Sequence, residues 1–193
     1  MIGCSGVIVF TNDLKQTCLV STKRKGNLGF PKGKRHGQGY SKEYSRGLMN
    51  PLGQGYSKEY SRGLKNPLGQ RYSKEYSRGE SYLETAFREL EEETGINEAY
   101  IDLVKSKDKN KEKDKEKDDF TFIDELSRKG NPCVRYFIGI LKEDYNDHKL
   151  TFDENELSKV EWFDVEKVKD LDMLRDNRKD IFEQALNKAK INS

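Results

Sequence analysis

The chain has 193 residues, a formal net charge of +2, and a composition that is 36% charged and 33% hydrophobic. This length predicts one domain, and the lean hydrophobic content indicates that some segments lie outside its core. The small net charge gives no global argument for nucleic-acid binding. The cysteines Cys4, Cys18 and Cys133 fit neither a zinc pattern nor a disulfide framework, so a reducing compartment is expected. The short apolar run at the N-terminus predicts no signal peptide and no membrane span.

The first elements predicted are two strands and a loop. Residues 6–10 predict a buried strand, and residues 17–21 predict its partner across a turn. Residues 28–34 then read Leu-Gly-Phe-Pro-Lys-Gly-Lys. Their glycines and proline predict a tight loop whose backbone approaches a ligand closely, although a plain turn gives the same pattern.

A tandem repeat fills residues 37–79. Residues 37–52 and 53–68 are identical except for Met49 against Lys65, and a partial third copy follows. The units are short and poor in aliphatic residues, so we expect a mobile loop rather than a solenoid. Six tyrosines interleave with eight Lys or Arg against three Glu, a composition that suits base stacking and phosphate binding. A tolerated surface insertion explains the segment equally well, because loops accept extra length at low cost.

Residues 81–94 predict a helix with one acidic face. Its apolar residues recur at helical spacing and form a stripe: Leu83, Ala86, Phe87, Leu90 and Thr94. Glu89, Glu92 and Glu93 stand at i, i+3 and i+4, so their carboxylates share the adjacent face. Gly95 then supplies a helix stop. Such hard oxygen ligands suit Mg²⁺ or Mn²⁺, whereas the ordinary alternative is a solvated acidic face.

The rest of the chain predicts further strands and a closing helix. Strands are expected at residues 99–104, 120–123 and 134–141, the last of them central. Residues 105–119 alternate Lys with Asp and Glu and predict a charged low-complexity loop. Val160 and Trp162 alternate as in another strand.

Residues 171–190 predict the C-terminal helix. Ile181, Phe182 and Ala185 face inward in this prediction, and several basic residues, including Arg175 and Arg178, accompany them. A helix packed on the sheet with a solvent-exposed charged face explains these basic residues equally well, without RNA binding.

The segment from Glu80 to Ile96 resembles the Nudix box, G-x5-E-x7-R-E-U-x-E-E-x-G-U with U aliphatic. The matching positions are Glu80, Arg88, Glu89, Leu90, Glu92, Glu93, Gly95 and Ile96. The first glycine of the motif is missing at its expected place, because Lys74 stands six residues before Glu80. We assign that glycine to Gly33, so that the five-residue spacer becomes 46 residues, 34–79, through the repeats.

The resemblance implies a fold and a chemistry. The fold is a Nudix α/β/α sandwich with a mixed sheet, formed by residues 1–193 as one domain that carries the long repetitive loop. The chemistry is hydrolysis of nucleoside diphosphate derivatives with Mg²⁺ or Mn²⁺. Metal is expected at Glu89, Glu92 and Glu93, with Glu80 supporting the metal shell.

The resemblance also implies roles around the metal. Glu156, with Glu154 or Asp153 as substitutes, or a box glutamate such as Glu92 or Glu93, takes the proton of the attacking water. Arg88 pairs with a box carboxylate and orients it. The loop residues Lys32, Gly33 and Lys34 contact phosphates.

The predicted substrate follows from two segments. Residues 29–34 and 155–163 resemble those of mRNA-decapping Nudix enzymes, which implies cleavage of a 5′ cap with release of 7-methylguanosine diphosphate. The basic repeats and the C-terminal helix would then bind RNA. A compact version without the regulatory domain, such as those of large DNA viruses, is expected in the cytoplasm, or in the host cytoplasm if viral.

Three other interpretations stay open. A dinucleoside polyphosphate or nucleotide-sugar hydrolase needs no basic groove. A Nudix-fold RNA- or nucleotide-binding module without turnover would result if the repeats spoiled the metal geometry. A structural or interaction protein would act through the tyrosine-rich repeats. The sequence does not predict an oligomeric state.

Overall fold

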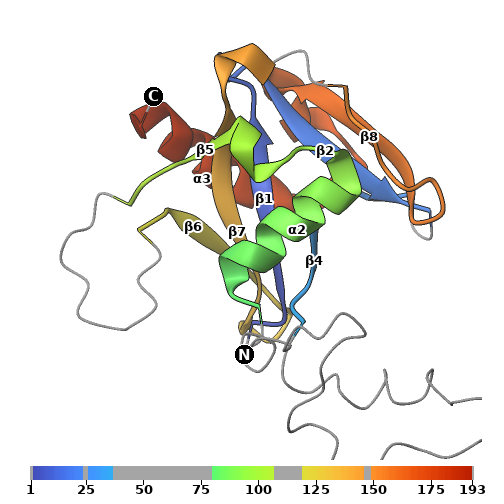
Figure 1. The fold of residues 1–193 in the computed structure, drawn as a ribbon. Helices are drawn as coiled ribbons and strands as arrows, with labels where there is room; N and C mark the ends of the chain where they lie inside the picture. The colour runs from blue at the N-terminus through green and yellow to red at the C-terminus, as the bar shows by residue number, and fades with distance from the viewer. Residues whose placement is uncertain (1, 24–25, 37–79, 107–118, 146–148, 193) are drawn as a thin grey trace, which may run out of the picture. The chain divides into compact units, whose positions relative to one another are not determined.

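A computed structural model of the chain describes residues 2–23, 26–36, 80–106, 119–145 and 149–192 (Figure 1). The chain divides into two units, one formed by Met1–Lys34 with Tyr82–Ser193 and the other by Arg35–Ser81. The repeats at 37–79 and most of the charged segment predicted at 105–119 lie outside the described residues. Their predicted character therefore stays a prediction.

The first unit is built on one mixed sheet. Among the described residues it has eight strands: β1 Cys4–Phe10, β2 Gln16–Thr22, β3 Leu28–Gly29, β4 Lys32–Lys34, β5 Ile101–Leu103, β6 Phe122–Leu126, β7 Pro132–Leu141 and β8 Leu157–Asp164. The central order is β3-β2-β1-β7-β5, while β4 pairs with β1, β6 with β7 and β8 with β2. β1 and β7 run parallel and the other pairs are antiparallel, so the sheet is mixed as predicted.

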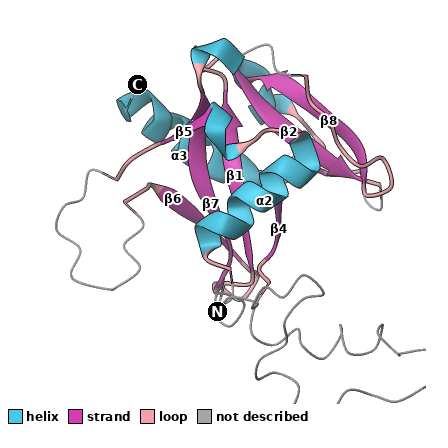
Figure 2. Ribbon diagram, in the orientation of Figure 1, coloured by secondary structure: helices cyan, strands magenta, loops and turns pink. Residues whose placement is uncertain are grey.

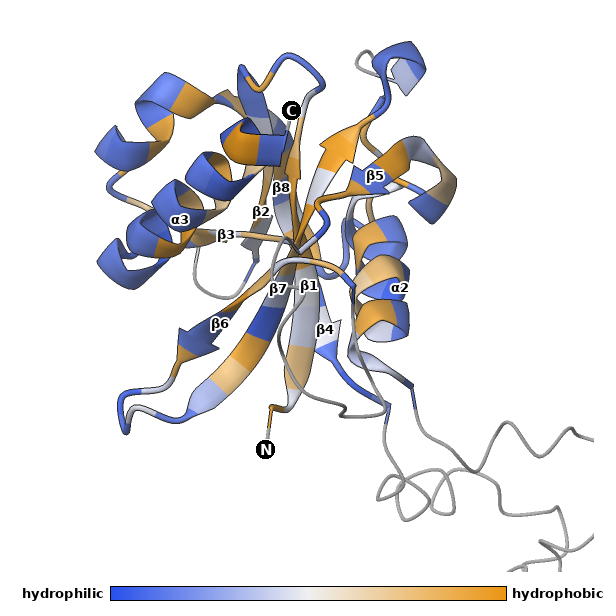
Figure 3. Ribbon diagram, turned by 90° about the vertical axis from the view of Figure 1, so that its left-hand side faces the viewer, coloured by the Kyte–Doolittle hydropathy of each residue, from blue (hydrophilic) through white to orange (hydrophobic). Residues whose placement is uncertain are grey.

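Two long helices cover opposite faces of this sheet. α2, Tyr82–Thr94, lies on one face and α3, Asp176–Asn192, on the other (Figures 1 and 3). Three short 3-10 helices lie between the longer elements: η3 Glu98–Tyr100 before β5, η4 Glu143–Tyr145 after β7 and η5 Val165–Asp170 after β8. Figure 2 shows how helices and strands alternate along the chain. The three layers confirm the predicted α/β/α sandwich. Within the described residues, we find no helix with the length and apolar character needed to cross a membrane.

Two hydrophobic layers hold the sandwich together. Successive side chains of a strand point to opposite faces. Val7 and Val9 of β1 therefore pack with the α2 layer, whereas Ile8 and Phe10 pack with the α3 layer. Both helices turn their apolar stripes inward, as the colouring of Figure 3 shows. Removing this apolar surface from water supplies the main drive for the fold.

Most of the predicted elements are confirmed within a few residues. The strands predicted at 6–10, 17–21 and 134–141 are the inner parts of β1, β2 and β7. The helix predicted at 81–94 is α2, and Gly95 ends it in a left-handed conformation with φ of +74°. The strand predicted at 120–123 begins and ends later, as β6.

Two predictions of local structure were wrong. The tight loop at 28–34 is instead β3 and β4, because β4 pairs with β1 and satisfies backbone groups that a loop would expose to water. The C-terminal helix begins at Asp176 rather than at 171, after η5 and an irregular stretch. Leu174 in that stretch is buried against the core, which fixes the backbone in a non-helical path.

Truncating Phe182 on α3 tests the α3 layer. The ring is fully buried and contacts Phe10 with a centroid separation of 5.8 Å. We expect Phe182→Ala to lower the free energy of unfolding by about 3–5 kcal/mol, measured by urea denaturation. The matched control is Ile191→Ala near the end of the same helix, where 64% of the side chain is exposed. An equal loss in the two variants would contradict this packing.

Candidate active site

The candidate site forms where α2 approaches β4. Glu89 and Glu93 lie one turn apart on α2 and both meet the β4 segment. Glu93 Oε2 accepts a hydrogen bond of 2.8 Å from the Lys32 backbone N–H. A Cβ atom at Gly33 would overlap the Glu89 carboxylate. A glycine at position 33 therefore lets the strand backbone reach the helix, which is what the assignment of the motif glycine requires.

Arg88 holds two of the box glutamates together. Its Nη1 donates to Glu89 Oε1 at 2.8 Å and to Glu92 Oε2 at 3.0 Å. Its Nη2 donates to the Lys34 backbone oxygen at 3.1 Å, which links the helix to the end of β4. Glu92 is 58% exposed, so its carboxylate reaches solvent at the outer edge of the site. This geometry fits the predicted orienting role of Arg88.

Glu93 is the most perturbed carboxyl group of the site. Burial raises its pKa from 4.5 to about 7. The hydrogen bond and the charge of Lys32 oppose this rise, while the negative charges of Glu89 and Glu156 add to it. The carboxyl is therefore held next to other acids, in a place where its negative charge is only partly compensated.

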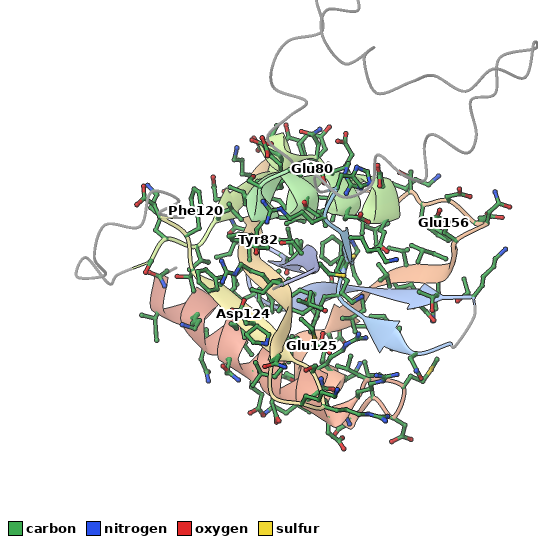
Figure 4. The ribbon with its side chains drawn as sticks, turned by 90° about the horizontal axis from the view of Figure 1, so that it is seen from below. Glu80, Tyr82, Phe120, Asp124, Glu125 and Glu156 are labelled. Atoms are coloured by element: carbon green, nitrogen blue, oxygen red, sulfur yellow. The ribbon has the colours of Figure 1, made fainter. Side chains whose placement is uncertain are left out.

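Glu156 comes from the opposite side of the site. Figure 4 shows it on the loop that leads into β8. Its side chain is exposed, and its charge acts on Glu93, so the late acidic segment and the box meet in space. Asp153 Oδ1 instead accepts hydrogen bonds from the backbone and side chain of Asn155 at 2.8 and 2.9 Å, which closes the turn. The Asp153 carboxylate is thus engaged in this turn.

Glu80 belongs to the unit Arg35–Ser81. Its Oε2 accepts a hydrogen bond of 3.1 Å from the His36 backbone N–H, and its backbone bonds to His36 and Arg35. The predicted support of the metal shell by Glu80 stays a prediction. The other predicted residues, from β4, α2 and the loop before β8, are brought together within the first unit.

The donor set of the box fits a divalent cation. Glu89, Glu92 and Glu93 offer hard carboxylate oxygens, the ligands that Mg²⁺ and Mn²⁺ prefer. In the described part of the chain, no three acidic, histidine or cysteine side chains are gathered as a ready metal cage. Arg88 and the Lys32 N–H occupy the box carboxylates instead. Burial, together with the nearby charges of Glu89 and Glu156, raises the pKa of Glu93, and a bound cation would stabilise the ionised carboxylate there.

Sequence reasoning missed a cavity beside Glu93. It has a volume of about 310 Å³ and is lined by Val20, Thr22, Asn27, Gly29, Phe30, Lys32, Glu93, Arg175 and Arg178. The two arginines stand about 140 positions from Lys32 in the sequence. Their basic character was visible in the sequence, but no periodicity relates residues of α3 and its approach to those of β4.

A comparison with protein families finds the NUDIX domain over residues 75–185. No curated protein matches the chain. Solved structures share the fold: a C. elegans Ap4A hydrolase complex has 15% identity, covers 99% of this chain and 96% of its own, and gives a TM-score of 0.51. The NUDIX domain of Shewanella oneidensis NrtR with ADP ribose has 15% identity, 98% and 88% coverage, and a TM-score of 0.52. RenU, a Nudix hydrolase from M. Smegmatis, has 10% identity, 100% and 88% coverage, and a TM-score of 0.55.

The matched segment covers more than half of the chain and takes in α2, the strands β5 to β8 and the first part of α3, so the chain belongs to the Nudix family. It is a Nudix pyrophosphohydrolase, an enzyme class that acts on nucleoside diphosphate derivatives and generally uses divalent metals.

Replacing Glu93 by Gln tests how much the ionised, buried carboxylate lowers the stability of the fold. A carboxyl whose pKa rises on folding binds its proton more tightly in the folded state, so stability falls as pH rises from about 4.5 to about 7. In EDTA at about pH 8, we expect Glu93→Gln to raise the free energy of unfolding by about 2–3 kcal/mol, and to change little at about pH 4. Urea denaturation at both pH values measures this. A variant that is less stable than the wild type at the higher pH would contradict the account.

Adding a methyl group at position 33 tests the contact between β4 and α2. Because the new Cβ would overlap the Glu89 carboxylate, we expect Gly33→Ala to lower kcat/KM by about 100-fold through displacement of that side chain. Gly3→Ala is the control, since a Cβ there meets nothing within 4 Å. Steady-state hydrolysis by both variants decides, and equal activity would show that Glu89 is not held against Gly33.

Proposed function

We propose that the chain hydrolyses the pyrophosphate linkage of a nucleoside diphosphate derivative at the α2–β4 site, with Mg²⁺ or Mn²⁺ as cofactor. The observation that supports this most is the convergence of two acids from different parts of the chain, Glu89 and Glu156, on Glu93. Glu89 and Glu156 both add negative charge there, and burial leaves that charge poorly solvated. An acidic group in this setting is suited to binding cations and, through them, phosphates.

Each residue has a role in the proposed reaction. Glu89, Glu92 and Glu93 would hold the divalent cation, which when bound neutralises phosphate oxygens and makes the phosphorus and the water more reactive. Arg88 keeps Glu89 and Glu92 oriented through its two hydrogen bonds. The Lys32 ammonium, on the strand that contacts Glu93, offsets phosphate charge.

Glu156 is proposed as the general base. A carboxylate oxygen of Glu156 accepts one proton from water while the water oxygen forms a bond to phosphorus. The bond between that phosphorus and the bridging oxygen breaks, and two phosphate products leave. Its exposed position on the loop before β8 gives it access to solvent water.

Capped RNA is the proposed substrate to test first, with 7-methylguanosine diphosphate as product. Lys188 and Lys190 on the outer face of α3 are exposed and offer cations to an RNA backbone. The composition of the repeats at 37–79 suits RNA as well, although those residues lie outside the described part. The structural neighbours include an Ap4A hydrolase and a NUDIX domain complexed with ADP ribose, so Ap4A and ADP-ribose represent the smaller substrates of the alternative interpretation.

A substrate panel tests both parts of the proposal, namely pyrophosphate hydrolysis and the choice of capped RNA as the substrate. Cap-labelled RNA, diadenosine tetraphosphate and ADP-ribose are incubated with Mg²⁺ or Mn²⁺, and products are separated by chromatography. We expect cleavage of capped RNA, and we expect Glu92→Gln and Glu156→Gln to lower kcat by at least about 100-fold. Glu154→Gln, two positions away on the same loop, is the control and should remain active.

The possible results distinguish the proposal of decapping from the proposal of hydrolysis. Cleavage of the small nucleotides alone would overturn the decapping proposal and keep the hydrolysis. Full activity of Glu156→Gln would remove Glu156 as the base. No metal-dependent cleavage of any substrate would leave the binding-module interpretation.

A further inference from the structure

The cavity beside Glu93 is basic and opens on the candidate site. Glu93 and Lys32 line it where it meets the box, and Arg175 and Arg178 line it on the α3 side. Three cationic side chains therefore face one carboxylate. A volume of about 310 Å³ lies at the lower end of the range for ligand pockets, so it suits a phosphate group better than a whole dinucleotide.

Arg178 is fixed in this cavity by the protein. Its Nη1 donates to the Leu28 backbone oxygen at 3.1 Å, and its Nε lies 3.6 Å from Glu125 Oε1. A Cβ at Gly29 would overlap the guanidinium, so the glycine lets Arg178 lie against β3. The side chain is 14% exposed, and its contacts with the protein hold it in place before a ligand binds.

Glu125 anchors Arg178 from the far side. Figure 4 shows Glu125 next to Asp124 on β6, and its contacts place it on the α3 face. Its two carboxylate oxygens accept hydrogen bonds of 3.0 Å from Tyr136 Oη and from Asn177 Nδ2. With both oxygens engaged, Glu125 supplies a fixed negative charge that holds the guanidinium in place. It is a positioning residue and does not line the cavity.

The cations of the cavity are incompletely matched by the protein. Arg178 Nε is buried and has no hydrogen-bond acceptor in the described part of the chain. No ion pair of Arg175 or of the Lys32 ammonium is found with any carboxylate of the described residues. The Arg178 Nε lies 3.6 Å from Glu125 Oε1, so among the described residues the charges that stay unpaired in the cavity are those of Arg175 and Lys32. Cations that line a cavity without a carboxylate partner suit the binding of an anion.

We propose that Lys32, Arg175 and Arg178 form a subsite for an additional phosphate next to the hydrolysed linkage. This inference rests on the proposed function and narrows its substrate class. Substrates bridged by three or more phosphates place a charged group in the cavity, whereas a two-phosphate bridge such as that of ADP-ribose leaves it empty. The enzyme is thereby selective for polyphosphate-bridged nucleotides, a class that includes the triphosphate bridge of a capped RNA.

Binding without turnover tests the subsite directly. Calorimetric titration with Mg²⁺, in proteins that also carry Glu156→Gln to suppress hydrolysis, compares tripolyphosphate with pyrophosphate for the unchanged cavity, Arg175→Gln and the control Arg128→Gln. Arg128 is an exposed arginine in the turn between β6 and β7, remote in sequence from all cavity residues. We expect Arg175→Gln to weaken tripolyphosphate binding by about tenfold, as the loss of one charge-assisted contact does, and Arg128→Gln to have no effect.

Positioning by Glu125 has its own readout. Glu125→Gln keeps a carbonyl acceptor but removes the charge that holds Arg178, so tripolyphosphate affinity should fall while pyrophosphate affinity stays the same. A merely structural role would lower stability and leave the ratio of the two affinities unchanged. Because Arg178 is buried, Arg178→Gln carries a risk of misfolding, and the exposed Arg175 keeps the subsite testable in a folded protein.

Turnover gives the second test. With Mg²⁺, kcat/KM should be higher for diadenosine triphosphate and tetraphosphate than for diadenosine diphosphate. Arg175→Gln should lower the ratio of these kcat/KM values by about tenfold. Unchanged binding and unchanged preference in Arg175→Gln would overturn the subsite. Arg175-dependent tripolyphosphate binding in a wild type that cleaves nothing would support the subsite and overturn the proposed function instead.

Discussion

The approach of β4 to the C-terminal half of α2 determines the rest of the site. β4 is held by its antiparallel pairing with β1, and α2 is held by its apolar stripe on the same sheet. Both elements are therefore fixed before any ligand binds. They approach so closely that a Cβ at position 33 would displace the Glu89 carboxylate, and the Lys32 N–H reaches Glu93. A rigid sandwich thus places acidic side chains on a surface that a flexible loop would position loosely.

This packing places the acidic side chains of the box next to the basic side chains of the cavity. The box supplies neighbouring acids, and burial together with the charges of Glu89 and Glu156 raises the pKa of Glu93. Immediately beside them, the cavity supplies cations that lack a full set of anions. A substrate with a divalent cation and a phosphate chain carries the complementary pattern of charge. Lys32 partly offsets the negative charge of Glu93, whereas Leu28 and Glu125 anchor Arg178 on the α3 side.

The elements that the sequence predicts well are those with strong periodicity. α2 and the strands β1, β2 and β7 follow from apolar spacing, and the box glutamates follow from a motif with fixed spacing. β4 was not predicted, because three residues with two lysines and a glycine have no strand period and depend on pairing with β1. The convergence of Arg175 and Arg178 with Lys32 was also beyond prediction, since it arises from the sheet order and from the path of the chain into α3. Local pattern gives the elements, and tertiary packing decides which of their side chains meet.

The box is a group of neighbouring acids, and we propose a divalent cation as its counter-charge. Calorimetric titration with Mg²⁺ in two buffers of different ionisation enthalpy tests it, because it counts the protons released on binding. With a Glu93 pKa of about 7, binding at pH 6 should release close to one proton, and binding at pH 8.5 should release almost none. Glu93→Gln should abolish the difference between the two pH values. Proton release that is the same at both pH values, or binding that is unaffected by the substitution, would contradict the account.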